Sequence, residues 1–237
     1  MVVRMRPWPT SGGPRLLLAT ALAALVATPS IADPLAALPD ENNILVVGKR
    51  WAMPANPDVL GTAALDAGVT IYDTRFRRVS SADRDHPEVL AMGAELAGLD
   101  PVGQLVRAKQ LVEARVRYAT DLETMHVADY WSSAGDTLQR GSGDDEDIAI
   151  VEMQVLKVAG FSPRDLYISV GRHKKKGAHA VLIARTAQGF FMLDQAEPRV
   201  VPASASLAGH FVPMMTIGSG RSFLHGYRVG SAAAGEH

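Results

Sequence analysis

The apolar pattern of this chain changes its period at Gly160, and this change limits the fold more than any other feature. Before it, apolar residues recur at helical spacing, as at Ile148, Val151, Val155 and Val158. After it, short runs rich in β-branched and aromatic residues are separated by turn residues, which predicts strands at 166–170, 178–185, 190–194, 199–201, 211–217 and 223–229. Helices followed by consecutive strands predict an α+β fold, with helices packed on one side of an antiparallel sheet.

Two further helices are predicted upstream. One covers 86–99, with Pro87 near its first turn, and the other covers 101–120 and begins at Pro101. The cations of the second helix fall mostly away from its apolar face and are expected to be solvated: Arg107, Lys109, Arg115 and Arg117. Short strands are expected at Ile44–Val47 and Thr70–Tyr72, and a loop or broken helix at 121–130.

The first 32 residues have the pattern of a secretory signal peptide. Three arginines, at positions 4, 6 and 15, precede an apolar run of about 12 residues, against the roughly 20 that a spanning helix needs. Small residues at Ser30 and Ala32 predict cleavage after Ala32. We therefore expect a periplasmic or secreted protein with no membrane span after cleavage; an uncleaved anchor is the alternative.

The remaining chain divides by pattern into an N-terminal extension and helical part at 33–100 and a core at 101–237. Without the three leader arginines, 21 of the 24 basic residues face 25 acidic ones, a net charge of −4. This balance argues against nucleic acid as a partner. The chain contains no cysteine, which excludes disulfides and thiol chemistry.

Asp145, His179 and Asp194 are the candidate catalytic residues. Asp145 falls at the start of a predicted helix, where free backbone N–H groups and the helix dipole favour a negative charge. If the hairpin turns near Gln188, Asp194 lies opposite Val181 and on the same face as His179, within side-chain reach. A carboxylate there can orient an imidazole, as in hydrolase triads. The alternative is a helix cap at Asp145, a sheet histidine at 179 and a turn residue at 194.

An ordered set of motifs carries a family resemblance over about 85 residues, from Leu111 to Asp194. The motifs are Arg117-Tyr118 with Asp121, Asp129-Tyr130-Trp131, Gly143-Asp144-Asp145-Glu146-Asp147, His179-Ala180-Val181-Leu182 and Leu193-Asp194. The set resembles the bacterial transglutaminase-like cysteine proteinases, which implies a papain-like or transglutaminase-like fold. In that family a cysteine occupies the position of Asp145, and the histidine and aspartate fall on His179 and Asp194.

The replaced nucleophile implies a protein without thiol peptidase activity. The first hypothesis is a pseudopeptidase that binds a peptide or protein partner in the former substrate groove. The second is a hydrolase with altered chemistry that uses Asp145, His179 and Asp194. The third is a structural domain without a ligand site.

The acidic residues around Asp145 and the tryptophan before them raise two more expectations. The resemblance implies calcium as a cofactor, with Asp144 and Glu146 as ligands, and carboxylates are the donors that calcium prefers; a solvated, capped turn is the alternative. Trp131 is expected to line the groove, or else to pack between helices and sheet. A hydrolytic metal site on His173 and His179 is not favoured, because their spacing matches no known ligand motif.

Overall fold

The computed structural model describes residues 60–83, 85–203, 210–218 and 220–226. These residues belong to one compact unit spanning Arg50–His237. The predicted signal peptide and the predicted strand at Ile44–Val47 lie outside the described residues.

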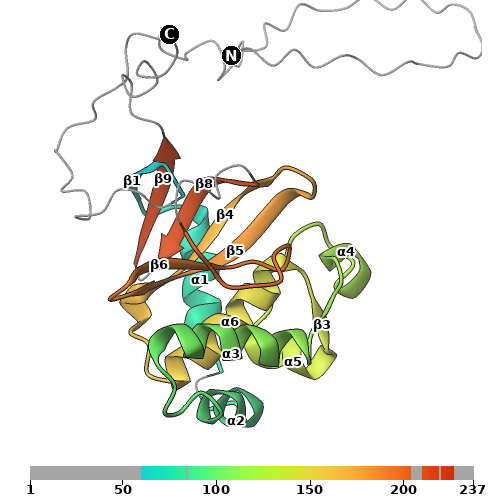
Figure 1. Cartoon of the computed structure of the whole chain (residues 1–237). Coiled ribbons are helices and arrows are strands. Elements are labelled where there is room, and N and C mark those ends of the chain that lie inside the picture. The colour runs from blue at the N-terminus through green and yellow to red at the C-terminus, as the bar shows by residue number, and fades with distance from the viewer. Residues whose placement is uncertain (1–59, 84, 204–209, 219, 227–237) are drawn as a thin grey trace, which may run out of the picture. The chain divides into compact units, whose positions relative to one another are not determined.

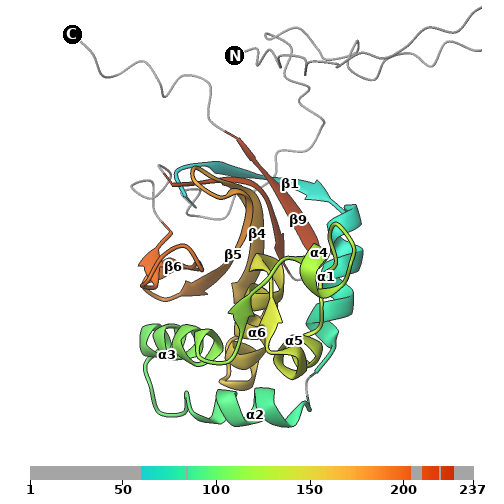
Figure 2. The same ribbon diagram turned by 90° about the vertical axis from the view of Figure 1, so that its right-hand side faces the viewer.

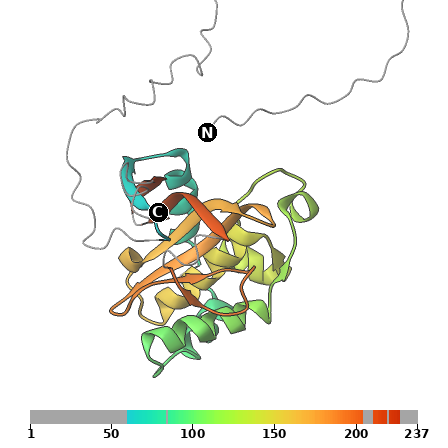
Figure 3. The ribbon, with the colours of Figure 1, turned by 45° about the horizontal axis from the view of Figure 1, so that its top comes forward.

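A seven-stranded sheet forms one layer of the fold (Figure 1). Its strand order is β1-β9-β8-β4-β5-β6-β7, and every neighbouring pair is antiparallel. The strands are β1 (Ala63–Gly68), β4 (Leu166–His173), β5 (Gly177–Thr186), β6 (Gly189–Leu193), β7 (Val201–Pro202), β8 (Phe211–Gly218) and β9 (Arg221–Gly226). Because β1 pairs with β9, the first and last described strands lie side by side (Figure 3).

Helices form the second layer (Figure 2). They are α1 (Ile71–Ser81), α2 (Pro87–Ala94), α3 (Pro101–Glu113), α4 (Asp121–Thr124), α5 (Ala134–Arg140) and α6 (Asp145–Val158). The central helix is α6, which contacts α2, α3 and α5 as well as β4 and β5. The predicted α+β fold is confirmed. None of the described helices is long and apolar enough to cross a membrane.

The larger apolar core lies between α6 and the sheet. It contains Ile148, Val151 and Val155, and Val158 packs against it as the predicted stripe requires. Alternate residues of β5 enter this core, among them Leu182, whereas Val181 and its neighbours on the other face join a smaller cluster. Helix α6 ends where predicted, since Gly160 just after it has φ 104°, a left-handed value that favours glycine.

The strand predicted at Thr70–Tyr72 is wrong, because helix α1 begins at Ile71 and the strand lies earlier, at β1. Thr70 and Asp73 form a capping box, in which Asp73 Oδ2 accepts a 2.5 Å hydrogen bond from the Thr70 backbone N–H. Phe76 and Val79 bury one face of the helix. The local cap and the helical apolar spacing therefore outweigh the β propensity of three residues.

The helix predicted over 101–120 ends at Glu113. The chain then forms β2 (Arg117–Tyr118), which pairs in parallel with β3 (Ser142–Gly143) just before α6. The helix predicted over 86–99 is likewise shorter, since α2 ends at Ala94. Helix α2, which lies before the predicted division at residue 100, packs on α6, which lies after it.

Candidate active site

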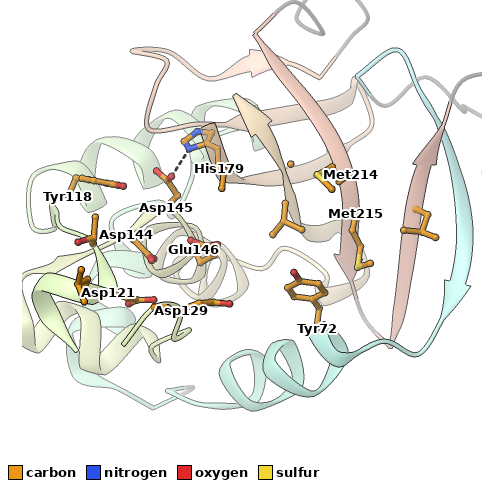
Figure 4. A pocket seen from close by; sticks show the side chains of 17 residues that line it. Tyr72, Tyr118, Asp121, Asp129, Asp144, Asp145, Glu146, His179, Met214 and Met215 are labelled. Atoms are coloured by element: carbon orange, nitrogen blue, oxygen red, sulfur yellow. Dashed lines mark hydrogen bonds and ion pairs between the residues drawn. The ribbon is translucent and has the colours of Figure 1, made fainter. Parts of the chain in front are cut away.

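The start of α6 sets the position of Asp145. The residue before it, Asp144, caps the helix by accepting a 3.2 Å hydrogen bond from the Asp147 backbone N–H. The alternative in which Asp145 caps the helix is therefore wrong, because the capping residue is Asp144, one position earlier. Asp145 is the first helical residue, and its side chain points to His179 instead (Figure 4).

Asp145, His179 and Asp194 meet in one hydrogen-bonded chain. His179 Nδ1 lies 2.6 Å from Asp145 Oδ2, and His179 Nε2 lies 2.6 Å from Asp194 Oδ1. All three side chains are buried. Leu182 of β5 pairs with Leu193 of β6, which is the register predicted to bring Asp194 beside the histidine. The structure thus brings the three predicted residues together; their catalytic role stays a prediction.

Two carboxylates flank one imidazole, and this arrangement favours the charged form of His179. Burial by itself lowers the pKa of His179, but the hydrogen bonds with Asp145 and Asp194 outweigh it and raise the pKa to about 9. For Asp194 the effects are reversed: burial raises its pKa, and the contacts with His179 hold it below its usual value. The imidazolium therefore donates a hydrogen bond to each carboxylate at neutral pH.

Asp194 is held by its backbone as well as by His179. The buried Lys109 of α3 donates a 2.7 Å hydrogen bond from Nζ to the Asp194 carbonyl oxygen and pairs with Glu113 at 2.8 Å. The expectation that Lys109 is solvated is wrong, because these acceptors replace water around its ammonium group. Nearby Glu152 is also buried, and burial raises its pKa to about 8, although Lys109 opposes this shift.

A pocket of about 560 Å³ opens beside Asp145 and His179. Its two sides differ in chemistry, as Figure 4 shows. The acidic wall consists of Asp121, Asp129, Asp144 and Glu146. The apolar wall consists of Tyr72, Val170, Met214, Met215 and Leu224. Between them, Asp145 Oδ1 is buried and has no hydrogen-bond partner among the described residues.

Two residues of the acidic wall, Asp121 and Asp144, form a tight carboxylate cluster with Asp147 behind them. Asp121, Asp144 and Asp147 each offer an oxygen within 4.8 Å of the others. Asp147 already has partners, because it accepts hydrogen bonds from Arg140 at 2.8 Å and from the Ser132 backbone N–H at 2.7 Å. In contrast, Asp121 Oδ1 is buried without a partner in the described part of the chain. Among the described residues, the ion pair of this cluster is that of Arg140 with Asp147, so three acids share one close cation.

The pKa values of three acids at the start of α6 are raised above their ordinary values. Burial is the main cause of each rise, to about 9 for Asp144, about 7 for Glu146 and about 6 for Asp147. Repulsion from neighbouring carboxylates adds to the rise for Asp144 and Glu146. A bound cation would lower all three values, so this wall is the part of the pocket best suited to a metal.

The predicted metal ligands Asp144 and Glu146 differ in their relation to the carboxylate cluster. Asp144 belongs to the carboxylate cluster, whereas Glu146 lines the same pocket but is not a member of that cluster. Sequence reasoning missed Asp121 as a possible ligand, although Asp121 is part of the motif that starts at Arg117. The available signal was its place directly after Thr120, which caps α4 and itself lines the pocket.

Trp131 does not line the pocket among the described residues, so the groove role predicted for it is wrong. Its side chain is 1% exposed and belongs to the larger core, with its ring centroid 6.0 Å from that of Tyr72. Its backbone oxygen accepts a 2.7 Å hydrogen bond from Arg78. The alternative, packing between the helices and the sheet, describes it correctly, and Tyr72 and Tyr118 supply the aromatic surface of the pocket instead.

The carboxylate of Asp145 limits the chemistry of this site. Attack by a carboxylate on an amide gives a high-energy mixed anhydride, so peptide hydrolysis by this route is unfavourable. The same group can take up an alkyl or acyl group from a substrate with a better leaving group. The charges nevertheless match those of a thiol enzyme, in which an anion at a helix N-terminus faces an imidazolium.

Comparison with known proteins supports the same family and the same fold. The sequence model of the bacterial transglutaminase-like cysteine proteinases matches residues 88–211. The chain is similar to calcium-bound LapG of Legionella pneumophila at 25% identity and a TM-score of 0.50, covering 56% of this chain and 74% of that one. EGTA-treated LapG and a third LapG structure each align at 22% identity and a TM-score of 0.50, covering 67% of this chain and 87% and 90% of theirs.

No curated protein sequence matches the chain. The family match nevertheless covers more than half of the 237 residues and includes Asp145, His179 and Asp194. The chain therefore belongs to the bacterial transglutaminase-like cysteine proteinase family, as a member that contains no cysteine.

Proposed function

We propose that this protein is an exported pseudopeptidase, which binds a peptide or protein segment in the pocket beside Asp145 without cleaving it. The observation that carries the proposal is the intact Asp145–His179–Asp194 chain at an open pocket, in a protein that has no thiol. The predicted signal peptide supports export to the periplasm or beyond it.

The two walls of the pocket indicate the kind of segment that fits. The methionines of the apolar wall are flexible side chains that adapt to apolar partners, and Met214 is 63% exposed. The acidic wall favours a positive group on the other side of the bound segment. An extended peptide with apolar residues and a basic residue therefore matches both walls.

The acidic wall offers the kind of ligand atoms that calcium prefers. Calcium takes carboxylate and carbonyl oxygens, and the cluster offers Asp121 and Asp144, with Asp147 already neutralised in part by Arg140. Asp121 Oδ1 has no partner within the described ranges, and it is a buried acceptor that a cation would satisfy. Calcium bound there would neutralise the wall and fix the α4 segment beside α6. The calcium in one LapG structure is consistent with this proposal.

A calcium titration followed by thermal unfolding tests the metal part. We expect calcium to raise the melting temperature, and Asp121→Asn and Asp144→Asn to abolish the rise. Asp136→Asn is the matched control, since Asp136 is an exposed acid in the first turn of α5. No rise in the wild-type protein, or an equal rise in all variants, would exclude calcium at this wall.

Peptides selected from a displayed library test the binding part. Binding should be lost in Met214→Glu and kept in Val212→Glu, because both residues are exposed on β8 but only Met214 lines the pocket. The selected peptides should remain intact after long incubation with the protein. Failure to select any pocket-dependent peptide would favour the structural-domain alternative.

A second candidate is a hydrolase with altered chemistry. It is favoured by Asp145 Oδ1, a carboxylate oxygen that has no hydrogen-bond partner among the residues that the structure describes, whereas Oδ2 contacts His179. Ester turnover that disappears in both Asp145→Asn and His179→Gln would support it, and a panel of esters without turnover would exclude it.

A further inference from the structure

Three metal-ligating side chains lie together outside the pocket. His173, Glu197 and His210 each offer one ligand atom within 4.8 Å of the other two. His210 Nδ1 is 3.8 Å from Glu197 Oε1, and the ring centroids of His173 and His210 are 6.3 Å apart. None of the three lines the pocket beside Asp145.

The backbone fixes the three segments before any ligand binds. His173 is the last residue of β4, and the backbone N–H of the next residue donates a 2.8 Å hydrogen bond to the His210 carbonyl. The Glu197 N–H donates a 3.1 Å hydrogen bond to the Asp194 carbonyl. The His173 side chain is buried, so one ligand of the set is rigid, whereas that of His210 is 63% exposed and can adjust.

The potential ligand atoms have few competing partners. In the described part of the chain, neither the Glu197 carboxylate nor the His210 ring makes a hydrogen bond, and their mutual contact at 3.8 Å is too long for one. His173 Nδ1 accepts only two long contacts of 3.3 Å, from the N–H groups of Lys175 and Lys176. Coordination through Nε2 would move the ring proton to Nδ1 and give up those two weak contacts.

We propose that His173, Glu197 and His210 form a binding site for a divalent transition metal of the Zn²⁺ class. Two imidazoles and one carboxylate are a donor set that suits zinc, with an open fourth position. Ligand atoms around tetrahedral zinc lie about 3.3 Å apart at the usual bond lengths, so the exposed side chains must close by roughly 1 Å. Calcium, a hard cation, prefers oxygen donors, which separates this site from the acidic wall.

An ion there would join three segments that surround the catalytic remnant. The His173 ring centroid is 5.4 Å from that of His179, and Glu197 follows Asp194 in the same turn. The ion would therefore tie the end of β4, the turn after β6 and the start of β8 to one another. This role is independent of the proposed calcium site and of peptide binding.

Titration of the untagged protein with Zn²⁺ by calorimetry, and with Co²⁺ by visible absorption, tests the site. We expect one equivalent to bind with micromolar or tighter affinity, and a Co²⁺ spectrum of low coordination number. His210→Ala and Glu197→Gln should each weaken binding by at least about tenfold. Both residues lie at the surface or near it, so these variants should fold, and thermal unfolding checks that they do.

His126→Asn is the matched control, because His126 is an exposed histidine away from the cluster, at φ 58°, which asparagine tolerates. Its zinc affinity should equal that of the wild type, as should that of Asp144→Asn. No binding by the wild type, equal binding by His210→Ala, or a loss confined to His126→Asn or Asp144→Asn would overturn the proposal.

Discussion

His179 Nδ1 lies 2.6 Å from the carboxylate of Asp145, the residue that the sequence resemblance aligns with the family's cysteine. The other ring nitrogen lies equally close to Asp194. On this alignment, the side chain of Asp145 would take the place of a thiolate beside the imidazole, without a reactive sulfur. The proposed replacement of cysteine by aspartate would preserve the electrostatics of the site while removing its nucleophile.

Neutralising Asp145 should lower the pKa of His179. In Asp145→Asn the imidazolium keeps one carboxylate instead of two, so its pKa should fall from about 9 toward its ordinary range. Imidazole NMR signals followed between pH 5 and 10 measure the change. His225 is an internal reference, because burial holds its pKa near 4 and it should remain neutral in both proteins. An unchanged His179 titration would contradict the assigned ion pair.

Without calcium, stability should fall as the pH rises from about 6.5 to 9. His179 has a raised pKa, so its stabilising effect is complete below 6.5 and is lost as the pH rises through about 9. The buried Asp144, whose pKa is also raised to about 9, binds its proton more tightly in the folded state, and so it destabilises the fold increasingly as the pH rises. Urea unfolding in EGTA at several pH values measures the slope.

Calcium should reduce that slope, because it binds the ionised carboxylates of the folded protein. We expect a larger rise in melting temperature at pH 8 than at pH 6. Asp144→Asn should flatten the calcium-free slope in part, and Asp136→Asn should leave it unchanged. A calcium effect that is the same at both pH values would contradict binding at the acidic wall.

The two neighbouring cations of α3 should differ sharply in their effect on stability. Lys109→Met removes the buried ammonium group that donates to the Asp194 carbonyl and that opposes the pKa rise of Glu152, and this should cost about 3 kcal/mol. Arg107→Met removes only an exposed ion pair with Glu95 and should cost less than about 1 kcal/mol. Urea unfolding at pH 7 compares them, and equal losses would mean that Lys109 supports the site no more than a surface residue does.

The sequence predicted the parts of the structure that depend on local periodicity. The strand pattern after Gly160 gave the antiparallel sheet, and the hairpin register placed Asp194 within reach of His179. The start of α6 was also predictable, since glycine and acidic residues precede an apolar stripe. Each of these features is encoded by residues close together in the chain.

The features that were missed depend on contacts between distant segments. Lys109 is a helix cation by pattern, and only the Asp194 carbonyl, 85 residues further on, makes its burial favourable. Trp131 enters the core because Tyr72 of α1 packs beside it. Asp121 joins Asp144 only once β2 has paired with β3. A pattern within a short stretch of sequence does not predict contacts between residues that are far apart in the chain.

The central proposal is that the site keeps the framework of a thiol enzyme around position 145. Its most direct test is the reactivity of Asp145→Cys toward iodoacetamide as a function of pH. The native chain has no cysteine, so the introduced thiol is the only one in the protein. If His179 and Asp194 retain the geometry of a thiol enzyme, the thiol should react as a thiolate well below the ordinary cysteine pKa of about 8.5. Asp145→Cys combined with His179→Gln should restore ordinary behaviour. A titration near 8.5 in both variants would mean that the site has lost the framework as well as its nucleophile.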